Sequence, residues 1–214
     1  MPPSPTPDTC WLYLIRHAAT DNNLAVPPVL QGRRTDPGLS AEGLEESRLT
    51  GLALAERPLS AVYSSPLLRA RQTAEAVAEP HGLEVQIVEE LVEADVGEWE
   101  GLDWGEVERN DSEAYRLFRD DASVNPYLGG ETLTTVYERS MPAIERLMAE
   151  NLGRMIAVAA HNVVNRSCLA KLIGSPLRMY RSVPQDNCGI NLLRYRKGRI
   201  KAVTINWVEH LDCD

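Results

Sequence analysis

The sequence predicts an α/β protein of three layers, in which helices cover both faces of a mostly parallel central sheet. Apolar runs of strand length recur along the chain, and helical patterns lie between them. The 214 residues, 43% hydrophobic and 25% charged, have a globular composition and suffice for one domain with a large buried core. We therefore expect a single domain over residues 1–214, with a proline-rich tail at 1–9 and a cap-like insertion at about 95–130 over the strand C-terminal edge.

Six segments have the composition of strands. Residues 10–15 and 155–160 are continuous apolar runs, which are typical of strands buried on both faces. Residues 83–88 alternate between apolar and polar side chains, which indicates a strand with one face exposed. The predicted strands are 10–15, 59–63, 83–88, 155–160, 189–195 and 201–207, with a turn at Lys197 and Gly198 between the last two.

Four helices are predicted between these strands. Ser40 is a suitable N-cap for the first, and Ser65 followed by Pro66 is a suitable start for the second. Gly174 and then Pro176 end the last one. The predicted helices cover residues 41–56, 67–78, 131–151 and 163–173.

The insertion is rich in aromatic residues among many charges. We expect its aromatic side chains to pack as a cover over one edge of the sheet. A bolder hypothesis is that the insertion also shapes a substrate pocket, with Arg109, Arg116 or Arg119 near an anion. Its aromatic residues are Trp99, Trp104, Tyr115, Phe118 and Tyr127.

Charge and cysteine content exclude several classes of protein. The 22 basic and 31 acidic residues give a net charge of −9, which argues against a nucleic-acid partner bound by bulk charge. No apolar stretch is long enough to span a membrane, and the first residues lack the pattern of a signal peptide, so we expect a cytoplasmic protein with no membrane partner. The cysteines and histidines lack ligand spacing, so we expect reduced thiols, no metal and no cofactor. The cysteines are Cys10, Cys168, Cys188 and Cys213.

Polar side chains follow three of the predicted strands directly. Arg16 and His17 follow the first strand, and His161 follows the fourth. Ser64 and Ser65 come at the end of the second strand, and Arg69 lies one turn into the helix that starts there. Because the carboxyl ends of parallel strands share one edge of a sheet, we expect the two histidines and two arginines to converge there.

Such a cluster is suited to phosphoryl transfer. Two guanidinium groups can bind phosphate oxygens in a bidentate manner, and their charge keeps a neighbouring histidine neutral. A neutral imidazole can attack phosphorus to form a phosphohistidine, while a second histidine stabilises charge on the phosphoryl oxygens. A carboxylic acid with a raised pKa can protonate the leaving alkoxide.

Several motifs, in their order along the chain, resemble those of a known family. Residues 16–20 look like an R-H-G-x-[ST] signature, and residues 64–74 match an S-S-x-L-x-R-A-x-x-T-A helix closely. Over nearly its whole length, the chain therefore resembles the histidine phosphatases, which form the phosphoglycerate-mutase-like superfamily. The other similar segments are 31–43 (Gln31, Gly32, Asp36, Leu39, Ser40 and Gly43), 93–101, 129–132 and 206–211.

The resemblance implies a role for each matching residue. It implies His17 as the nucleophile, Glu93 as the proton donor and His161 as the second histidine. It also implies a phosphate pocket formed by Arg16, Arg69 and Asn23, with Thr20 at the family's small hydroxyl position. Two positions depart from the family pattern: Ala18 replaces a glycine, and Asn162 with Val163 replaces the residues that usually follow the second histidine.

The leading functional hypothesis is a metal-independent phosphomonoesterase that hydrolyses a small phosphorylated metabolite through a phosphohistidine. A phosphotransfer isomerase of the phosphoglycerate mutase type would share the site, but the resemblance implies a longer chain with a basic lid for it. A non-catalytic relative that binds a phosphorylated ligand is the third hypothesis, prompted by Ala18 and Asn162. The substrate stays open among sugar phosphates, phosphoglycerates, nucleotide-like cofactor precursors and phosphohistidine proteins, as does the oligomeric state.

Overall fold

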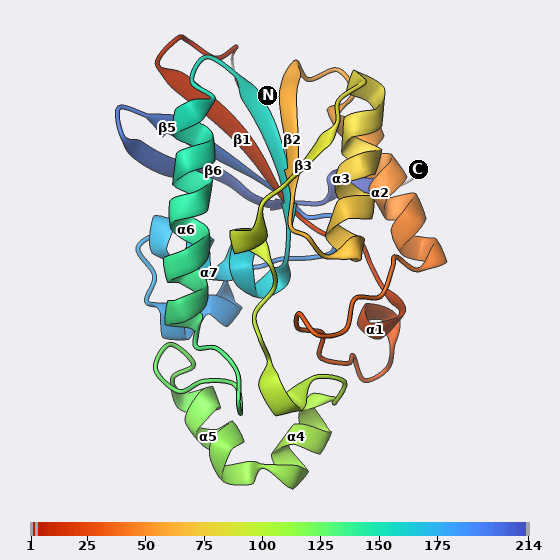
Figure 1. Cartoon of the computed structure of the whole chain (residues 1–214), viewed down its shortest axis with the longest axis vertical. Helices are drawn as coiled ribbons and strands as arrows, with labels where there is room; N and C mark the ends of the chain where they lie inside the picture. Colours follow the sequence, from red (N-terminus) through yellow and green to blue (C-terminus); the bar gives the residue numbers. More distant parts are fainter. Residues whose placement is uncertain (1, 3, 213–214) are drawn as a thin grey trace.

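A computed structural model describes residues 2 and 4–212 of the chain (Figure 1). It contains a six-stranded sheet with the strand order β3-β2-β4-β1-β5-β6. The neighbouring strands from β3 to β1 pair in parallel, whereas β5 is antiparallel to both β1 and β6. The predicted α/β class with a mostly parallel sheet is confirmed. The strands are β1 (Thr9–Arg16), β2 (Leu59–Ser64), β3 (Val85–Ile87), β4 (Met155–Ala160), β5 (Ile190–Arg196) and β6 (Arg199–Trp207).

All six predicted strands exist, with small differences at their ends; β6, for example, begins at Arg199 rather than at residue 201. The edge strand β3 is shorter than the predicted segment 83–88, because it pairs with β2 at only three positions before the chain turns away. Thr9 belongs to β1 rather than to the tail, since it pairs with Arg196 of β5. Positions 1 and 3 of the predicted tail lie outside the described residues.

Helices cover both faces of the sheet, as predicted. Leu12 and Leu14 of β1 are fully buried in a core with α6 and α7, whereas Tyr13 and Ile15 face a second core with α2 and α3. This alternation follows from the two-residue period of a strand, and burial of each leucine stabilises the fold by about 1.5–3 kcal/mol. Figure 1 shows α6 on one side of the sheet and α2 with α3 on the other. These helices are α2 (Ala41–Leu54), α3 (Leu68–Ala78), α6 (Leu133–Glu150) and α7 (Asn162–Leu172).

One predicted helix cap is confirmed and another is wrong. The Ser40 hydroxyl accepts a hydrogen bond from the backbone N–H of Gly43 at 3.0 Å, which caps α2. The N-cap of α3 is Leu67 rather than Ser65, because the helix begins only at Leu68. The Ser65 hydroxyl accepts from the Leu67 N–H and is hydrogen-bonded to the imidazole of His161.

The segment from about 95 to 130 forms two short helices that the helical patterns did not predict. Figure 1 shows α4 and α5 beyond the end of the sheet, on the same side as α1, which follows β1. Trp99, Phe118 and Tyr127 are buried there, with the rings of Phe118 and Tyr127 4.4 Å apart between centroids. These helices are α1 (Asp21–Leu24), α4 (Trp104–Asn110) and α5 (Ser112–Asp120).

Five short 3₁₀ helices complete the described elements. They are η1 (Glu79–His81), η2 (Glu89–Leu91), η3 (Gly97–Trp99), η4 (Leu177–Ser182) and η5 (Glu209–Leu211). Among the described helices, none combines the length and the apolar character required to cross a bilayer.

Candidate active site

The two predicted strand-end histidines lie side by side. Arg16 is paired with Ala160 at the end of the parallel ladder between β1 and β4, so the residues that follow, His17 and His161, leave the sheet at the same edge. The backbone N–H of His17 donates to the Ala160 carbonyl at 2.9 Å. The two imidazole rings are 5.2 Å apart between centroids and tilted by 58°.

His17 is held as a neutral imidazole with one defined tautomer. Its Nδ1 lies 2.7 Å from the carbonyl oxygen of Ala18, and since a carbonyl only accepts, Nδ1 carries the hydrogen. The lone pair is therefore on Nε2. Burial and the charges of Arg69 and Arg16 hold the pKa of His17 well below its ordinary value, because all three disfavour the imidazolium ion.

Arg69 and Arg16 bring positive charge to the two histidines. Arg69, near the start of α3, is fully buried and donates to the Gly32 carbonyl at 2.8 Å, while its Nη1 lies 3.8 Å from Asp36. Arg16 donates to the Gln185 carbonyl at 2.7 Å. Burial lowers the pKa of Arg16 to about 10, so the side chain stays cationic at neutral pH. In each guanidinium, Nε is buried without a hydrogen-bond partner among the described residues, which leaves a donor for an anion.

A hydrogen bond to Ser65 orients the imidazole of His161. Its Nε2 lies 2.6 Å from the Ser65 hydroxyl, while Nδ1 is buried without a partner in the described chain. Burial, Arg69 and then His17 hold the pKa of His161 well below its ordinary value. Ser65 was predicted as a helix cap and as a polar residue at the end of the second strand, but its contact with His161 was not predicted.

Glu93 is a buried carboxylate that faces the same cavity as His17. Its side chain accepts hydrogen bonds from the backbone N–H of Ala94 at 2.9 Å and from that of Val163 at 3.2 Å, in the first turn of α7. Burial raises the pKa of Glu93, and the two backbone donors oppose that shift only in part. The raised pKa favours the protonated acid that a proton donor requires.

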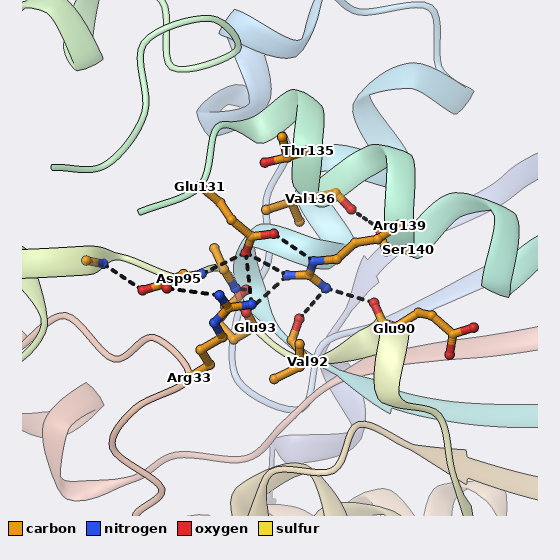
Figure 2. A network of polar contacts seen from close by, with 12 residues as sticks. Arg33, Glu90, Val92, Glu93, Asp95, Glu131, Thr135, Val136, Arg139 and Ser140 are labelled. Atoms are coloured by element: carbon orange, nitrogen blue, oxygen red, sulfur yellow. Dashed lines mark hydrogen bonds and ion pairs between the residues drawn. The ribbon is translucent and has the colours of Figure 1, made fainter. Parts of the chain in front are cut away.

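An arginine of α6 holds the loop that carries Glu93 (Figure 2). The guanidinium of Arg139 donates to the backbone carbonyls of Glu90, Val92 and Glu93 at 2.8, 2.7 and 3.1 Å. It also binds both carboxylate oxygens of Glu131, at 2.9 and 3.1 Å. Figure 2 shows this guanidinium between the loop and α6, and the sequence analysis did not single it out.

Asn23 and Thr20 form one hydrogen-bonded unit beside the histidines. The backbone N–H of Thr20 donates to Asn23 Oδ1 at 3.0 Å, and the Thr20 hydroxyl lies 3.0 Å from both that atom and Gln31 Oε1. Asn23 lines the cavity that His17 faces. Thr20 is fully buried and contacts the cavity through Asn23 and Gln31, which both line it.

Comparison with known proteins identifies the family. The model of the histidine phosphatase superfamily (branch 1) matches residues 12–208. The chain belongs to this superfamily. It is a phosphoric monoester hydrolase with the histidine phosphatase fold.

The relatives of this histidine phosphatase include enzymes with different substrates in their names. It is 31% identical over 202 residues to phosphoserine phosphatase 1 of Hydrogenobacter thermophilus, covering 94% of this chain and 93% of the relative. It is 31% identical over 173 residues to glucosyl-3-phosphoglycerate phosphatase of Mycolicibacterium vanbaalenii, covering 78% and 75%. The solved phosphoserine complex of a phosphoserine phosphatase mutant from Entamoeba histolytica is 26% identical, with a TM-score of 0.84 over 94% of this chain and 99% of that one.

The two departures from the family pattern are accommodated by the backbone. Among the described residues other than glycine, positive φ occurs at Cys188, Lys197 and Asn206, so Ala18 has the ordinary backbone of an L-residue. The Ala18 N–H donates to the Thr73 hydroxyl at 3.0 Å. At the second departure, the backbone N–H of Val163 binds Glu93.

The histidine phosphatase has a cavity of about 270 Å³ in front of His17. Trp104 of α4 lines this cavity. The insertion arginines that we considered as anion ligands do not line it; they are Arg109, Arg116 and Arg119. Two other arginines do, and the sequence analysis missed both. They are Arg166 of α7 and Arg181 of η4. Within the described part of the chain, no group of three or more His, Cys, Asp or Glu side chains gathers to hold a metal ion.

Proposed function

We propose that this histidine phosphatase hydrolyses a small phosphorylated metabolite through a phosphohistidine at His17, without a metal ion. One observation carries the proposal: the hydrogen bond from Nδ1–H to Ala18 leaves the lone pair of a neutral imidazole on Nε2, beside two arginines. The relatives named for phosphoserine and glucosyl-3-phosphoglycerate support a small metabolite as the substrate.

In the first step, Nε2 of His17 attacks phosphorus as the bond from phosphorus to the alcohol oxygen breaks. Arg16 and Arg69 bind the phosphoryl oxygens through the guanidinium donors that the protein leaves unpaired. The charge that builds on those oxygens in the transition state meets two fixed cations in a buried site, where electrostatic stabilisation is strong. Asn23 completes the phosphate pocket, and Thr20 orients Asn23.

His161 acts as a neutral hydrogen-bond donor to the transferring group. The Ser65 hydroxyl accepts from the Leu67 N–H at 3.3 Å, which leaves its hydrogen free to point at Nε2 of His161. The ring hydrogen is then on Nδ1, the buried nitrogen without a partner in the described chain. From there it donates to a phosphoryl oxygen.

Glu93 moves the protons. In the first step the protonated carboxyl gives its proton to the departing alkoxide and becomes a carboxylate. In the second step the carboxylate takes a proton from water, which attacks phosphorus and breaks its bond to His17 Nε2. Inorganic phosphate leaves, and both His17 and Glu93 return to their starting states.

A labelling experiment tests this mechanism. The wild-type protein, incubated with a radiolabelled phosphoester and quenched, is expected to carry an acid-labile, alkali-stable label on one histidine. His17→Ala should lose the label and nearly all turnover, and treatment with a chelator should change neither. Wild-type turnover by His17→Ala, or loss of wild-type activity with the chelator, would contradict the proposal.

Product analysis and a substrate panel distinguish the proposal from the two alternative functions, a mutase and a non-catalytic relative. With 3-phosphoglycerate and a bisphosphate primer, the proposal predicts inorganic phosphate rather than 2-phosphoglycerate, the product expected of a mutase. A non-catalytic relative would bind vanadate but hydrolyse no member of a broad panel of phosphoesters.

A further inference from the structure

Two arginines lie in the substrate cavity on elements that follow the second histidine. Arg166 is on α7, four residues after Asn162, so both side chains lie on the same side of that helix and both line the cavity with His17. Arg181 reaches it from η4. None of the steps proposed for phosphoryl transfer uses either guanidinium.

Aromatic rings fix the guanidinium of Arg181. Its central carbon lies 5.2 Å from the ring centroids of Trp104, Phe118 and Tyr180. Contacts of this kind orient a cation without neutralising its charge. Its Nη2 is buried and has no hydrogen-bond partner among the described residues, so a fixed donor remains available.

Arg166 also has a hydrogen-bond donor without a partner among the described residues, its buried Nε. Burial lowers the pKa of Arg166, whereas Tyr180 and Asp186 oppose that shift. The charge of Arg181 adds to the shift, as expected for two neighbouring cations. The acid whose charge acts on Arg166, Asp186, instead accepts a hydrogen bond from Asn206 at 2.6 Å.

Neither arginine forms an ion pair with a carboxylate of the described residues. This is notable in a chain with a net charge of −9, in which acids outnumber basic residues by 31 to 22. Two partly buried cations that face one small cavity without an ion-paired carboxylate are stabilised when an anion binds between them.

We propose that Arg166 and Arg181 form a subsite for a second anionic group, a carboxylate or a second phosphate, on the alcohol part of the substrate. This inference rests on the proposed function, in which the reacting phosphate occupies the site of His17, Arg16 and Arg69. The cavity volume of about 270 Å³ is just below the about 300–1,000 Å³ typical of drug-sized ligands, so the alcohol is a compact one. Substrate selection then depends on charge at both ends of a short molecule.

Matched pairs of substrates test the subsite. The first pair is 3-phosphoglycerate and glycerol 3-phosphate, in which a carboxylate is replaced by a hydroxymethyl group. The second is phosphoserine and phosphoethanolamine, which lacks the carboxylate. The third is propane-1,3-diol bisphosphate and its monophosphate. We expect kcat/KM to be about 10- to 100-fold higher for the doubly anionic member of at least one pair, as charge-assisted hydrogen bonds predict. The pair with the largest ratio identifies the second anion.

Substitution of the arginines assigns that preference to the subsite. Arg166→Met combined with Arg181→Met should reduce the preferred ratio to about one, and Arg166→Lys with Arg181→Lys should retain part of it. Arg178→Met is the control: Arg178 is an exposed arginine of η4, and its substitution should leave the ratio unchanged. Circular dichroism verifies that each variant is folded.

The possible failures are distinguishable. If the wild type hydrolyses both members of all three pairs equally well, the subsite is wrong while the proposed function stands, and this result needs no variant. If the folded methionine double variant keeps the preference, the subsite is also wrong. If the wild type hydrolyses no phosphoester at all, the proposed function itself fails.

Discussion

Replacement of Arg139 by methionine should destabilise the protein and impair the proton donor together. The arginine makes five hydrogen bonds, three to backbone carbonyls of the loop that carries Glu93 and two to Glu131 of the segment before α6. Methionine has a similar length and apolar stem but supplies no donor. All three carbonyls and the Glu131 carboxylate then lose this partner at once.

The expected loss of stability can be estimated from this geometry. Removal of one member of a buried charge pair costs about 3–5 kcal/mol. We expect about 3 kcal/mol, the lower end, because the Arg139 side chain is 20% exposed and Glu131 still accepts from the Asp95 N–H at 2.8 Å. That loss is a large share of the about 5–15 kcal/mol that stabilises a typical domain.

A second arginine of α6 provides a matched control. Arg146 pairs with the Glu90 carboxylate at 3.0 Å, but the two side chains are 49% and 42% exposed. Arg146→Met should therefore cost at most about 1 kcal/mol. Urea unfolding at neutral pH measures both variants. If Arg139→Met and Arg146→Met lower the free energy of unfolding equally, the hydrogen bonds from Arg139 do not stabilise the loop that carries Glu93. Among folded molecules, Arg139→Met should also lower kcat for an alkyl phosphate more than for p-nitrophenyl phosphate.

Three further predictions follow from the site and its supports. Glu93→Gln should lower kcat for alkyl phosphates about 100- to 10,000-fold but affect p-nitrophenyl phosphate far less, since nitrophenolate leaves without a proton; an equal loss for both would contradict the role of Glu93 as the acid. Because the pKa of His17 is lowered, kcat/KM should stay constant as pH falls through 6.5. Because the pKa of Glu93 is raised, kcat/KM should decrease only as pH rises through the raised pKa of Glu93. A decrease of kcat/KM on the acid side near pH 6.5 would show that His17 is not held neutral by its surroundings. Gly43→Ala should cost about 1–3 kcal/mol in urea unfolding, since its Cβ would overlap the Ala19 carbonyl, whereas a Cβ at Gly38 meets only the side chains of Gln72 and Leu68, so Gly38→Ala should cost less.

Much of the fold could be predicted because its signals are local. The apolar runs of β1 and β4 exceed anything expected of a surface segment, and both are buried along their length. The short helices α4 and α5 were not predicted as helices, since they depend on packing around Trp99 and Phe118 rather than on a long apolar period. The edge strand β3 was predicted too long because pairing with a single neighbour decides where it ends.

The residues of the candidate site likewise fall into those that local sequence could predict and those that it could not. Arg16, His17 and His161 follow strands directly, so parallel topology was enough to predict that they converge. Arg166 could have been found, because it lies on the predicted helix 163–173, four residues after Asn162. Arg139 and Arg181 could not, because their roles come from partners distant in sequence: Arg139 is 46 residues from Glu93, and Arg181 packs on Trp104.

In the proposed mechanism, the phosphate site and two residues of the alcohol site, Trp104 and Arg181, come from separate parts of the molecule. The first depends on strand ends in the middle of the sheet, whereas Trp104 and Arg181 are supplied by α4 and by η4 outside it. Residues on these peripheral elements can therefore be exchanged without moving the nucleophile. Redesign of the enzyme for new phosphoesters should therefore begin with the residues of α4 and η4 and leave the residues around His17 unchanged.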